Sequence, residues 1–256
     1  MFHVTSFNIR FDDTSDQKKS WKIRKPLLNS LLKKYHWDII GVEEPVLQQM
    51  LDIQKMLNWD YFGVGRDDGL EKGEFTAVFY NSNRFTLLES GHFWLSETPD
   101  VPSVYATAMF PRICVWGKLA DSDGKQFFVF NTHLDHVSEE ARLFAIQFIL
   151  QRAELISEGA PLILLGDLNS QPTTLTYQHI IEKYQDAKLI AKTPAIGPNG
   201  SFHDFNPRRP ENQLQRIDYI FVSNAFQVIT YETITDEMNG FSASDHFPVT
   251  ALVDWK

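Results

Sequence analysis

Cysteine is almost absent from this sequence: its 256 residues include one, Cys114, in the apolar run ICVW. A single thiol excludes a disulfide-stapled scaffold and a zinc site built on clustered cysteines. Because Cys114 lies among apolar residues, we expect a buried structural thiol rather than a nucleophile. Long apolar runs are also missing from the sequence, and none reaches the length that a membrane-spanning helix requires.

Positive charge is scarce as well. The chain has 24 Lys and Arg against 33 Asp and Glu, a formal net charge of −9. Such a surface repels polyanions at long range and argues against a protein that coats nucleic acid. A phosphate-ester substrate stays open, because a bound metal ion inverts the local field. The first residues, MFHVTSFNIR, contain neither the basic nor the apolar segment of a signal peptide, so we expect a soluble, cytoplasmic protein.

Apolar and aromatic side chains are what the sequence has in abundance. Hydrophobic residues make up 43% of it, including 20 Phe and 6 Trp, enough for a thick core in a chain of this length. The sequence shows no internal repeat, low-complexity tract or long linker. We therefore interpret residues 1–256 as a single domain.

Two kinds of hydrophobic pattern alternate along the chain. Period-2 or continuous apolar segments predict strands at 4–9, 37–44, 74–81, 84–96, 111–120, 125–136, 161–167, 215–223, 226–234 and 247–255. Helical periodicity predicts helices at 21–35, from Pro45 onward, at Ser138–Ser157 with Ser138 as N-cap, and at Thr173–Tyr184. Polar loops are expected at 13–20 and 192–213. This order predicts sheet packed on sheet with helices outside.

Polar side chains stand where these apolar strands begin or end. The stretch PLILLGDLNSQP (161–172) leads into Asp167 and Asn169, two oxygen-bearing side chains on the same side of the chain. The pattern recurs at Asn8, Glu43-Glu44, Asn131, His133, Asp135, His136, Asp218 and Asp245-His246. A buried carboxylate is costly unless it is paired or binds a metal. One pocket that gathers these groups explains the pattern better than a series of separate turns.

The chemistry of this set is that of metal-assisted hydrolysis. Carboxylate and Asn oxygens are hard ligands that suit Mg²⁺ or Mn²⁺, which bind through a few carboxylates plus substrate phosphate. Zinc held by His133 and His136 is the weaker alternative, because a third nitrogen or sulfur ligand nearby is lacking. The set predicts hydrolysis of a phosphate ester: a metal acts as Lewis acid, a His–Asp pair activates water, and Asn and His hold the phosphoryl group.

At these residues the sequence resembles the endonuclease/exonuclease/phosphatase superfamily of divalent-metal phosphohydrolases, and most of all its compact bacterial branch. The matching motifs, in family order, are TSFNIR (5–10), DIIGVEE (38–44), NTHLDH (131–136), GDLN (166–169), RIDYIFVS (216–223) and SDHFPV (244–249). The resemblance implies a four-layered α/β sandwich, with two mixed β-sheets face to face flanked by helices. It also implies a phosphodiesterase or phosphomonoesterase that uses Mg²⁺ or Mn²⁺.

The resemblance further implies roles for individual residues. Those expected at the metal are Asn8, Glu44 and Asp245, with Glu44 as the direct ligand. Those expected to orient water, contact the phosphate or transfer protons are His133, Asp167, Asn169, Asp218, Asp245 and His246. Those expected to bind substrate are Arg112, in FPRICVW, Asn131 and His136. Where the family has Gln-Glu this chain has Glu43-Glu44, and the extra carboxylate either binds a second cation or faces solvent.

The substrate is less sharply defined by the sequence. Basic patches are KIRK (22–25), interpreted as a solvated helix face, and RR (208–209), in a loop that is a candidate for substrate specificity. With the acidic net charge, they favour a phosphorylated small molecule or a short nucleic-acid end over long duplex. Two alternatives stay open: a catalytically silent module that binds a phosphorylated ligand, and a lipid-headgroup phosphodiesterase, which no amphipathic basic helix supports. Nothing in the sequence indicates an obligate protein partner or stable membrane association.

Overall fold

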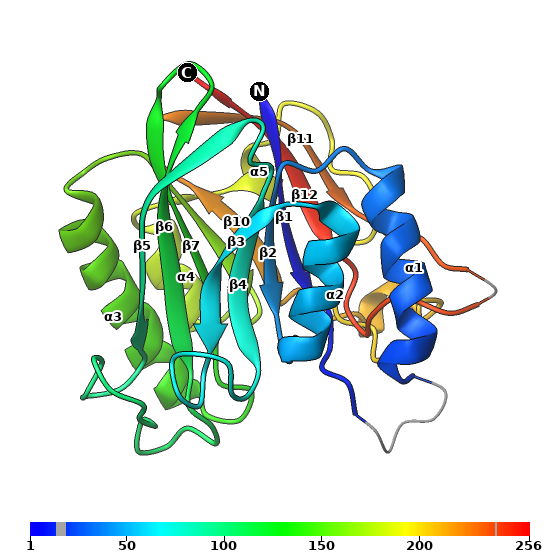
Figure 1. Ribbon diagram of the computed structural model, residues 1–256, viewed down its shortest axis with the longest axis horizontal. Helices are drawn as coiled ribbons and strands as arrows, with labels where there is room; N and C mark the ends of the chain where they lie inside the picture. Colours follow the sequence, from blue (N-terminus) through cyan, green and yellow to red (C-terminus); the bar gives the residue numbers. More distant parts are fainter. Residues whose placement is uncertain (14–18, 239) are drawn as a thin grey trace.

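The protein is a four-layered α/β sandwich (Figure 1). The structure is a computed structural model that describes residues 1–13, 19–238 and 240–256. Two mixed six-stranded sheets pack face to face and helices cover their outer faces, so the predicted fold class is confirmed. Within the described ranges, no helix combines the length and the apolarity that crossing a bilayer demands.

The first sheet has the strand order β11-β12-β1-β2-β4-β3. Its strands are β1 (Phe2–Asn8), β2 (Ile39–Glu43), β3 (Asp60–Gly65), β4 (Phe75–Tyr80), β11 (Phe226–Thr233) and β12 (Val249–Trp255). β1 and β2 are parallel and the other neighbours are antiparallel. The helices on its outer face are α1 (Trp21–Lys34) and α2 (Leu47–Leu57).

The second sheet has the order β5-β6-β7-β8-β10-β9. Its strands are β5 (Phe85–Trp94), β6 (Ile113–Asp121), β7 (Gln126–His133), β8 (Leu162–Asp167), β9 (Gln185–Asp186) and β10 (Asp218–Val222). β7 and β8 are parallel. The helices on its outer face are α3 (Glu139–Ser157) and α4 (Leu175–Ile181), and two short helical segments, α5 (Ala187–Ile190) and a 3-10 turn (Glu211–Gln213), lie in the connections after β9.

The space between the sheets changes character along the strands. At one end the aromatic rings of Phe2, Phe127 and Phe226 pack together, with centroids 5.3–6.2 Å apart. At the other end the inward-facing positions of the same sheets carry polar groups, including Asn8 and Asp167. Strand residues alternate between the two faces of a sheet. Each strand therefore fills the core with apolar inward residues and, at the opposite end, places a polar residue at its last inward position.

Most predicted elements are present, with shifted ends. Ser138 is the N-cap of α3, because its hydroxyl accepts a hydrogen bond from the backbone N–H of Ala141 at 3.1 Å. Pro26 lies in the second turn of α1, where it removes the hydrogen bond that a backbone N–H would donate to the carbonyl of Lys22. Cys114 is fully buried, as predicted. Strands β3 and β9 were not predicted, and residues 14–18 of the expected 13–20 loop lie outside the described residues.

Candidate active site

Strand direction brings the polar ends of distant segments to one edge of the sandwich. Parallel β1 and β2 end in Asn8 and Glu43, which are paired, and parallel β7 and β8 end in His133 and Asp167, also paired. β10 runs antiparallel to β8, so its first residue, Asp218, lies opposite Asp167. β12 runs antiparallel to β1, and residues 245–246 therefore enter at the same edge. Strand pairing therefore brings these residues to one edge of the sandwich.

The glycine of the GDLN motif makes this close approach possible. Gly166 has a φ of 141°, and a Cβ there would lie 2.0 Å from the carbonyl oxygen of Thr132 on β7. Any side chain would push β8 away from β7. Gly166 therefore sets the separation at which His133 and Asp167 meet.

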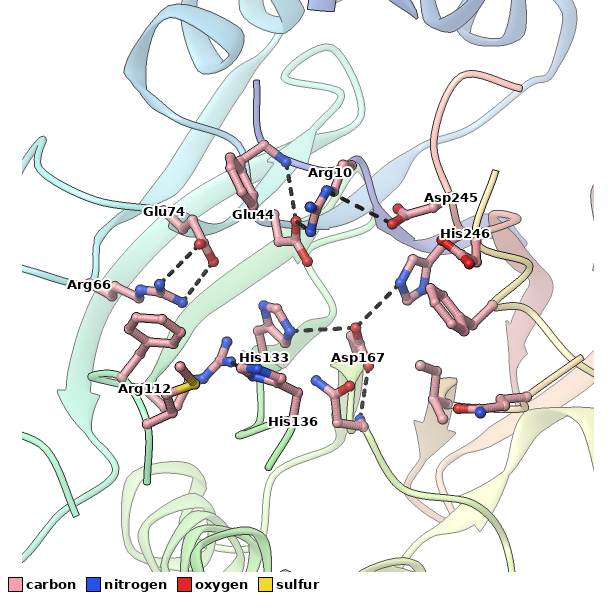
Figure 2. Close-up of a pocket in the computed structure, with 18 residues that line it drawn as sticks. Arg10, Glu44, Arg66, Glu74, Arg112, His133, His136, Asp167, Asp245 and His246 are labelled. Atoms are coloured by element: carbon pink, nitrogen blue, oxygen red, sulfur yellow. Dashed lines mark hydrogen bonds and ion pairs between the residues drawn. The ribbon is translucent and has the colours of Figure 1, made fainter. Parts of the chain in front are cut away.

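A pocket of about 530 Å³ opens at this edge (Figure 2). The predicted site residues that line it are Glu44, Arg112, His133, His136, Asp167, Asn169, Asp245 and His246. Asn8 and Asp218 lie just behind the lining and hydrogen-bond to it. Asn131 does not line the pocket. The lining residues that the sequence did not single out include Arg10, Phe11, Arg66, Glu74, Met109 and Phe110, whereas Phe202 and Asp204 belong to the loop SFHDFNPRR (201–209), the candidate for substrate specificity.

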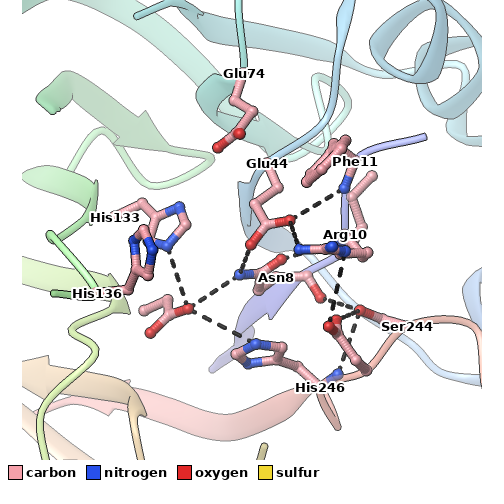
Figure 3. Close-up of polar contacts among 12 residues, drawn as sticks. Asn8, Arg10, Phe11, Glu44, Glu74, His133, His136, Ser244 and His246 are labelled. Atoms are coloured by element: carbon pink, nitrogen blue, oxygen red, sulfur yellow. Dashed lines mark hydrogen bonds and ion pairs between the residues drawn. The ribbon is translucent and has the colours of Figure 1, made fainter. Parts of the chain in front are cut away.

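Asn8 connects two carboxylates at the pocket floor (Figure 3). Its Nδ2 donates to Glu44 Oε1 and to Asp167 Oδ2, at 3.0 Å each. Its Oδ1 accepts from the backbone N–H of Arg10 at 3.0 Å. Glu44 Oε2 accepts from the backbone N–H of Phe11 at 3.2 Å. Asn8 thus presents its nitrogen to the carboxylates and positions both of them.

Unusual backbone conformations gather around the pocket. Among the described residues, seven non-glycine residues have left-handed φ angles, and four of these line the pocket: Arg10 (57°), Glu44 (71°), Asn169 (47°) and Asp204 (53°). Such conformations cost roughly 1–3 kcal/mol each and persist where the surroundings enforce them. The Glu44 conformation is enforced by the Asn8 and Phe11 hydrogen bonds to its carboxylate.

Asp167 is the most heavily contacted carboxylate of the site. Its Oδ1 accepts from the backbone N–H of Asn169 at 2.9 Å, and its Oδ2 lies 3.5 Å from His133 Nε2 and 3.8 Å from His246 Nε2. Burial, reinforced by the charge of Asp218, raises the pKa of Asp167 to about 7. This carboxyl is therefore poised to gain or lose a proton near neutral pH.

His246 forms a buried pair with Asp218. Its Nδ1 lies 2.8 Å from Asp218 Oδ2, which orients the ring so that Nε2 faces Asp167. Burial alone lowers the pKa of His246, but the charges of Asp218, Asp167 and Asp245 together raise it well above its usual value. The pair favours an imidazolium beside Asp167.

His133 stands on the other side of Asp167 and has the opposite tendency. Burial, followed by the charges of Arg112 and Arg66, lowers its pKa well below the ordinary value. Asp167 therefore faces the neutral imidazole of His133 on the second-sheet side of the pocket and the imidazolium of His246 on the other side.

An arginine wall closes the pocket beside His133. We use this name for Arg66, Glu74, Phe110 and Arg112. Arg66 binds Glu74 through two hydrogen bonds of 2.7 and 2.9 Å, and its guanidinium lies 4.8 Å from the centre of the Phe110 ring. Arg66 and Glu74 were missed because they flank a charged hairpin loop, which in sequence looks like any solvated turn.

The donor set fits a hard divalent cation. Glu44 Oε2 and Asp245 Oδ2 both face the Arg10 guanidinium, at 3.5 and 3.9 Å, so carboxylates from opposite ends of the sequence converge on one positive group. Candidate ligand atoms of Asp167, Asp218 and His246 lie within 4.8 Å of one another, and in the imidazolium form of His246 the two carboxylates are the donors of this group. Oxygen-rich groups of this kind suit Mg²⁺ or Mn²⁺.

Asn131 does not reach the pocket, contrary to its expected role in substrate binding. It is fully buried, and its Nδ2 donates to the carbonyls of Val42 and Ala77 in the opposite sheet, at 3.2 and 2.9 Å. A Cβ on Gly41 would lie 3.0 Å from its Oδ1, so Gly41 covers it. Asn131 joins the two sheets beneath the pocket.

Two other expectations need correction. Glu43 does not face solvent: it is fully buried, and burial, with the charges of Asp218 and Asp167, raises its pKa well above normal. The KIRK segment is not a fully solvated face either, because Arg24 is 1% exposed. Its guanidinium donates to five backbone carbonyls, those of Ile9, Arg10, Phe11, Lys19 and Ala243.

Arg24 matters to the site because of where those carbonyls lie. The carbonyls of residues 9–11 follow Asn8, and the carbonyl of Ala243 precedes Asp245. One buried guanidinium therefore joins the segment of Arg10 and Phe11, which contact Glu44, to the segment that carries Asp245. In sequence, nothing distinguishes Arg24 from its neighbouring lysines.

Comparison with known proteins agrees with this geometry. The family model described as Endonuclease/Exonuclease/phosphatase family matches residues 5–246. A mannosyl-6-phosphatase from Bacteroides thetaiotaomicron has 36% identity and a TM-score of 0.93, with 100% of both chains covered. A conserved protein of unknown function from Enterococcus faecalis has 33% identity and a TM-score of 0.94, covering 99% of this chain and 100% of that chain.

More distant relatives include longer proteins. An uncharacterised protein of Acanthamoeba polyphaga mimivirus is 29% identical over 91% of this chain and 92% of its own. Mouse nocturnin is 26% identical over 67% of this chain, and the match spans 41% of nocturnin. Together with the two-sheet fold and the gathered motif residues, the match over residues 5–246 places this chain in the endonuclease/exonuclease/phosphatase family of phosphoesterases.

Proposed function

We propose that this protein hydrolyses a small phosphate ester with the help of a divalent cation, Mg²⁺ or Mn²⁺. The observation that carries the proposal is the position of Asp167, a buried carboxylate at the pocket floor that faces two imidazoles and the Asn8 amide. Membership of the family supports the reaction class.

Asp167 is suited to orient and deprotonate the attacking water. A general base works best when its pKa lies near the working pH, and burial raises the pKa of Asp167 to about 7. Asn169 donates its backbone N–H to Oδ1 and its side-chain Nδ2 to the carbonyl of Leu134 at 3.0 Å, which fixes the loop beside the carboxylate. The base is therefore held in one orientation.

The two imidazoles flank the position that the phosphoryl group would occupy. His246, protonated through its pairing with Asp218, supplies a charged N–H donor and a proton for the leaving oxygen. His133, kept neutral by burial and by Arg112, supplies an uncharged contact. A cation held by Glu44, Asp245 and their neighbours would supply Lewis-acid stabilisation of the charge on the phosphoryl oxygens.

A small phosphorylated molecule, in the first place a sugar phosphate, is the proposed substrate. The pocket of about 530 Å³ is in the range of small-ligand sites. The net charge of −9 does not favour a polyanion. The mannosyl-6-phosphatase from Bacteroides thetaiotaomicron is similar along the whole chain, so mannose 6-phosphate is a reasonable first substrate.

The test is a screen with Mg²⁺ or Mn²⁺ against mannose 6-phosphate, other sugar phosphates, 4-nitrophenyl phosphate, bis(4-nitrophenyl) phosphate and short oligonucleotides. We expect metal-dependent turnover of one or more small esters, abolished by EDTA. Binding of inorganic phosphate without turnover of any ester would instead support the silent binding module. Turnover of oligonucleotides alone would replace the small-molecule substrate with a nucleic-acid end.

A further inference from the structure

We propose that Arg112 acts through His136: it holds the imidazole as a neutral Nε2–H donor that contacts an uncharged oxygen of the group esterified to the phosphate. The second half of this statement rests on the proposed function. The first half concerns a pair of side chains and is testable by itself.

The hydrogen bond between the two residues has one possible direction. Arg112 Nη2 lies 3.1 Å from His136 Nδ1. A guanidinium has no acceptor, so Arg112 must donate and Nδ1 must carry no proton. A neutral imidazole with a bare Nδ1 bears its proton on Nε2. An imidazolium would lose this bond, because both of its nitrogens are donors.

Arg112 itself is set back from the substrate. The residue is 6% exposed, its Nε lies 4.0 Å from Asp135 Oδ2, and within the described residues neither Nε nor Nη1 makes a hydrogen bond. These two nitrogens are also sealed from solvent. A substrate in the pocket therefore meets the exposed imidazole of His136 before it meets the guanidinium.

Arg112 and His136 are held in place by a loop and an aromatic ring that are themselves fixed. Asp135 accepts hydrogen bonds from the backbone N–H groups of Met109, Val137 and Ser138 at 2.8–2.9 Å, which ties the loop before β6 to the start of α3. The Phe110 ring lies nearly parallel to the His136 ring, with centroids 6.0 Å apart and an interplanar angle of 18°. The imidazole is therefore held by a donor on one nitrogen and an aromatic face.

The charges around His136 keep it neutral. The charged groups that face it are Arg112, Asp135, Glu44 and Arg66, and burial followed by Arg112 lowers its pKa. Its Nε2–H is thus an uncharged donor. The strongly charged positions around Asp167 suit phosphoryl oxygens, whereas a neutral donor beside Met109 and Phe110 suits a hydroxyl or ring oxygen of the esterified group.

Three substitutions at His136 test separately whether the substrate contact needs an N–H donor and whether that donor must lie at the Nε2 position. His136→Gln keeps an N–H near the Nε2 position, His136→Asn moves it to the Nδ1 position, and His136→Leu removes it. We expect kcat/KM of the Leu and Asn variants to fall about fivefold more for mannose 6-phosphate than for 4-nitrophenyl phosphate, which has no hydroxyl, mainly through KM. The Gln variant is expected to retain most of the discrimination. An equal fall for both substrates in all three variants would overturn the substrate contact.

The Arg112 half is tested by long-range ¹H–¹⁵N spectra of the imidazoles. The native protein should show a bare Nδ1 and a protonated Nε2 at His136. Arg112→Met should raise the pKa of His136, Arg112→Lys should leave it low, and Arg152→Met, on α3, should leave it unchanged. A proton on Nδ1 in the native protein overturns the proposal. So does an unchanged His136 titration in Arg112→Met together with a raised KM for every substrate, because Arg112 would then bind substrate itself.

The two failures are distinguishable. If the native protein hydrolyses no phosphate ester with either metal, the proposed function fails, while the spectra still decide whether Arg112 sets the protonation of His136.

Discussion

His246 and the pair His133 and His136 lie in one pocket and have opposite acid–base behaviour. Carboxylates surround His246, and the charges of Asp218, Asp167 and Asp245 raise its pKa against the effect of burial. Guanidiniums stand beside the other two, and burial together with Arg112 lowers both of their pKa values. The same type of side chain, histidine, therefore provides an acid on one side of the pocket and a neutral contact on the other.

A histidine with little charge beside it shows what burial does. Burial lowers the pKa of His203 to about 3, with the charge of His246 as a smaller contribution. Its ring packs on Phe247, with centroids 4.1 Å apart. Compared with His203, His246 has a raised pKa because carboxylates surround it. When two titratable groups of one site have pKa values shifted in opposite directions, the shifts indicate which group is the acid and which the base.

The largest effect is expected where both sides of the pocket meet, at Asp167. Asp167→Asn keeps the shape but removes the base, and we expect kcat to fall by about 10³-fold or more on every accepted substrate. Steady-state kinetics measure the loss, and Asp123→Asn, in an exposed turn, is the matched control. Turnover within tenfold of the native value would remove Asp167 from the chemistry.

Asp218→Asn tests why His246 is the acid. Without this charge the pKa of His246 should fall, so the alkaline limb of the kcat profile should move to lower pH, and kcat near neutrality should drop by about 10²-fold. The pH–rate profile is the measurement. A profile displaced to higher pH would contradict the assignment.

His203→Leu tests the effect of burial without a carboxylate partner. Because the folded pKa of about 3 lies below the usual 6.5, the unfolded chain binds the proton more readily, and stability is lost as pH falls from about 7 toward 3. At pH 5 the loss is about 2 kcal/mol. Urea unfolding at pH 7 and pH 5 should show this loss in the native protein and less of it in the variant. An equal pH dependence in both would contradict the prediction.

Glu74→Gln is expected to have the smallest effect. Glu74 offsets the charge of Arg66 in the arginine wall, and burial, with the charge of Glu44, raises its pKa to about 7. The variant should lower KM for anionic esters by about threefold at pH 8, where Glu74 is ionised, and by less at pH 6, where it is already protonated. A larger change at pH 6 than at pH 8 would show that charge is not the cause.

The two sides of the pocket also differ in how far sequence could predict them. Asn8 and Asp167 end strands, Glu44 directly follows β2 and His246 shortly precedes β12, so strand direction brings them to one edge, and their motifs are visible in sequence. The sandwich itself was predictable for the same reason, because buried runs and amphipathic helices alternate clearly.

Of the arginine wall, Arg112 was expected from the family resemblance, but Arg66 and Glu74 were not predictable in this way. Arg66 and Glu74 meet through the register of the β3–β4 hairpin, and β3 is interrupted by two glycines that weaken its pattern. Arg24 sits within a run of lysines, and only tertiary contact distinguishes a buried cation from a solvated one. Asn131 failed for another reason: it lies two residues before His133, on the same inward face of β7 but deeper between the sheets, where its side chain contacts Gly41 rather than the pocket.

The pairing of β12 with β1 has a consequence for how the protein is made. During translation, residues 1–233 leave the ribosome with the place between β11 and β1 still vacant. Asp245 and His246 come shortly before β12 in the sequence, so the nascent chain also lacks them until just before this strand is made. Hydrolytic activity should therefore switch on abruptly when the last strand inserts, rather than growing with chain length.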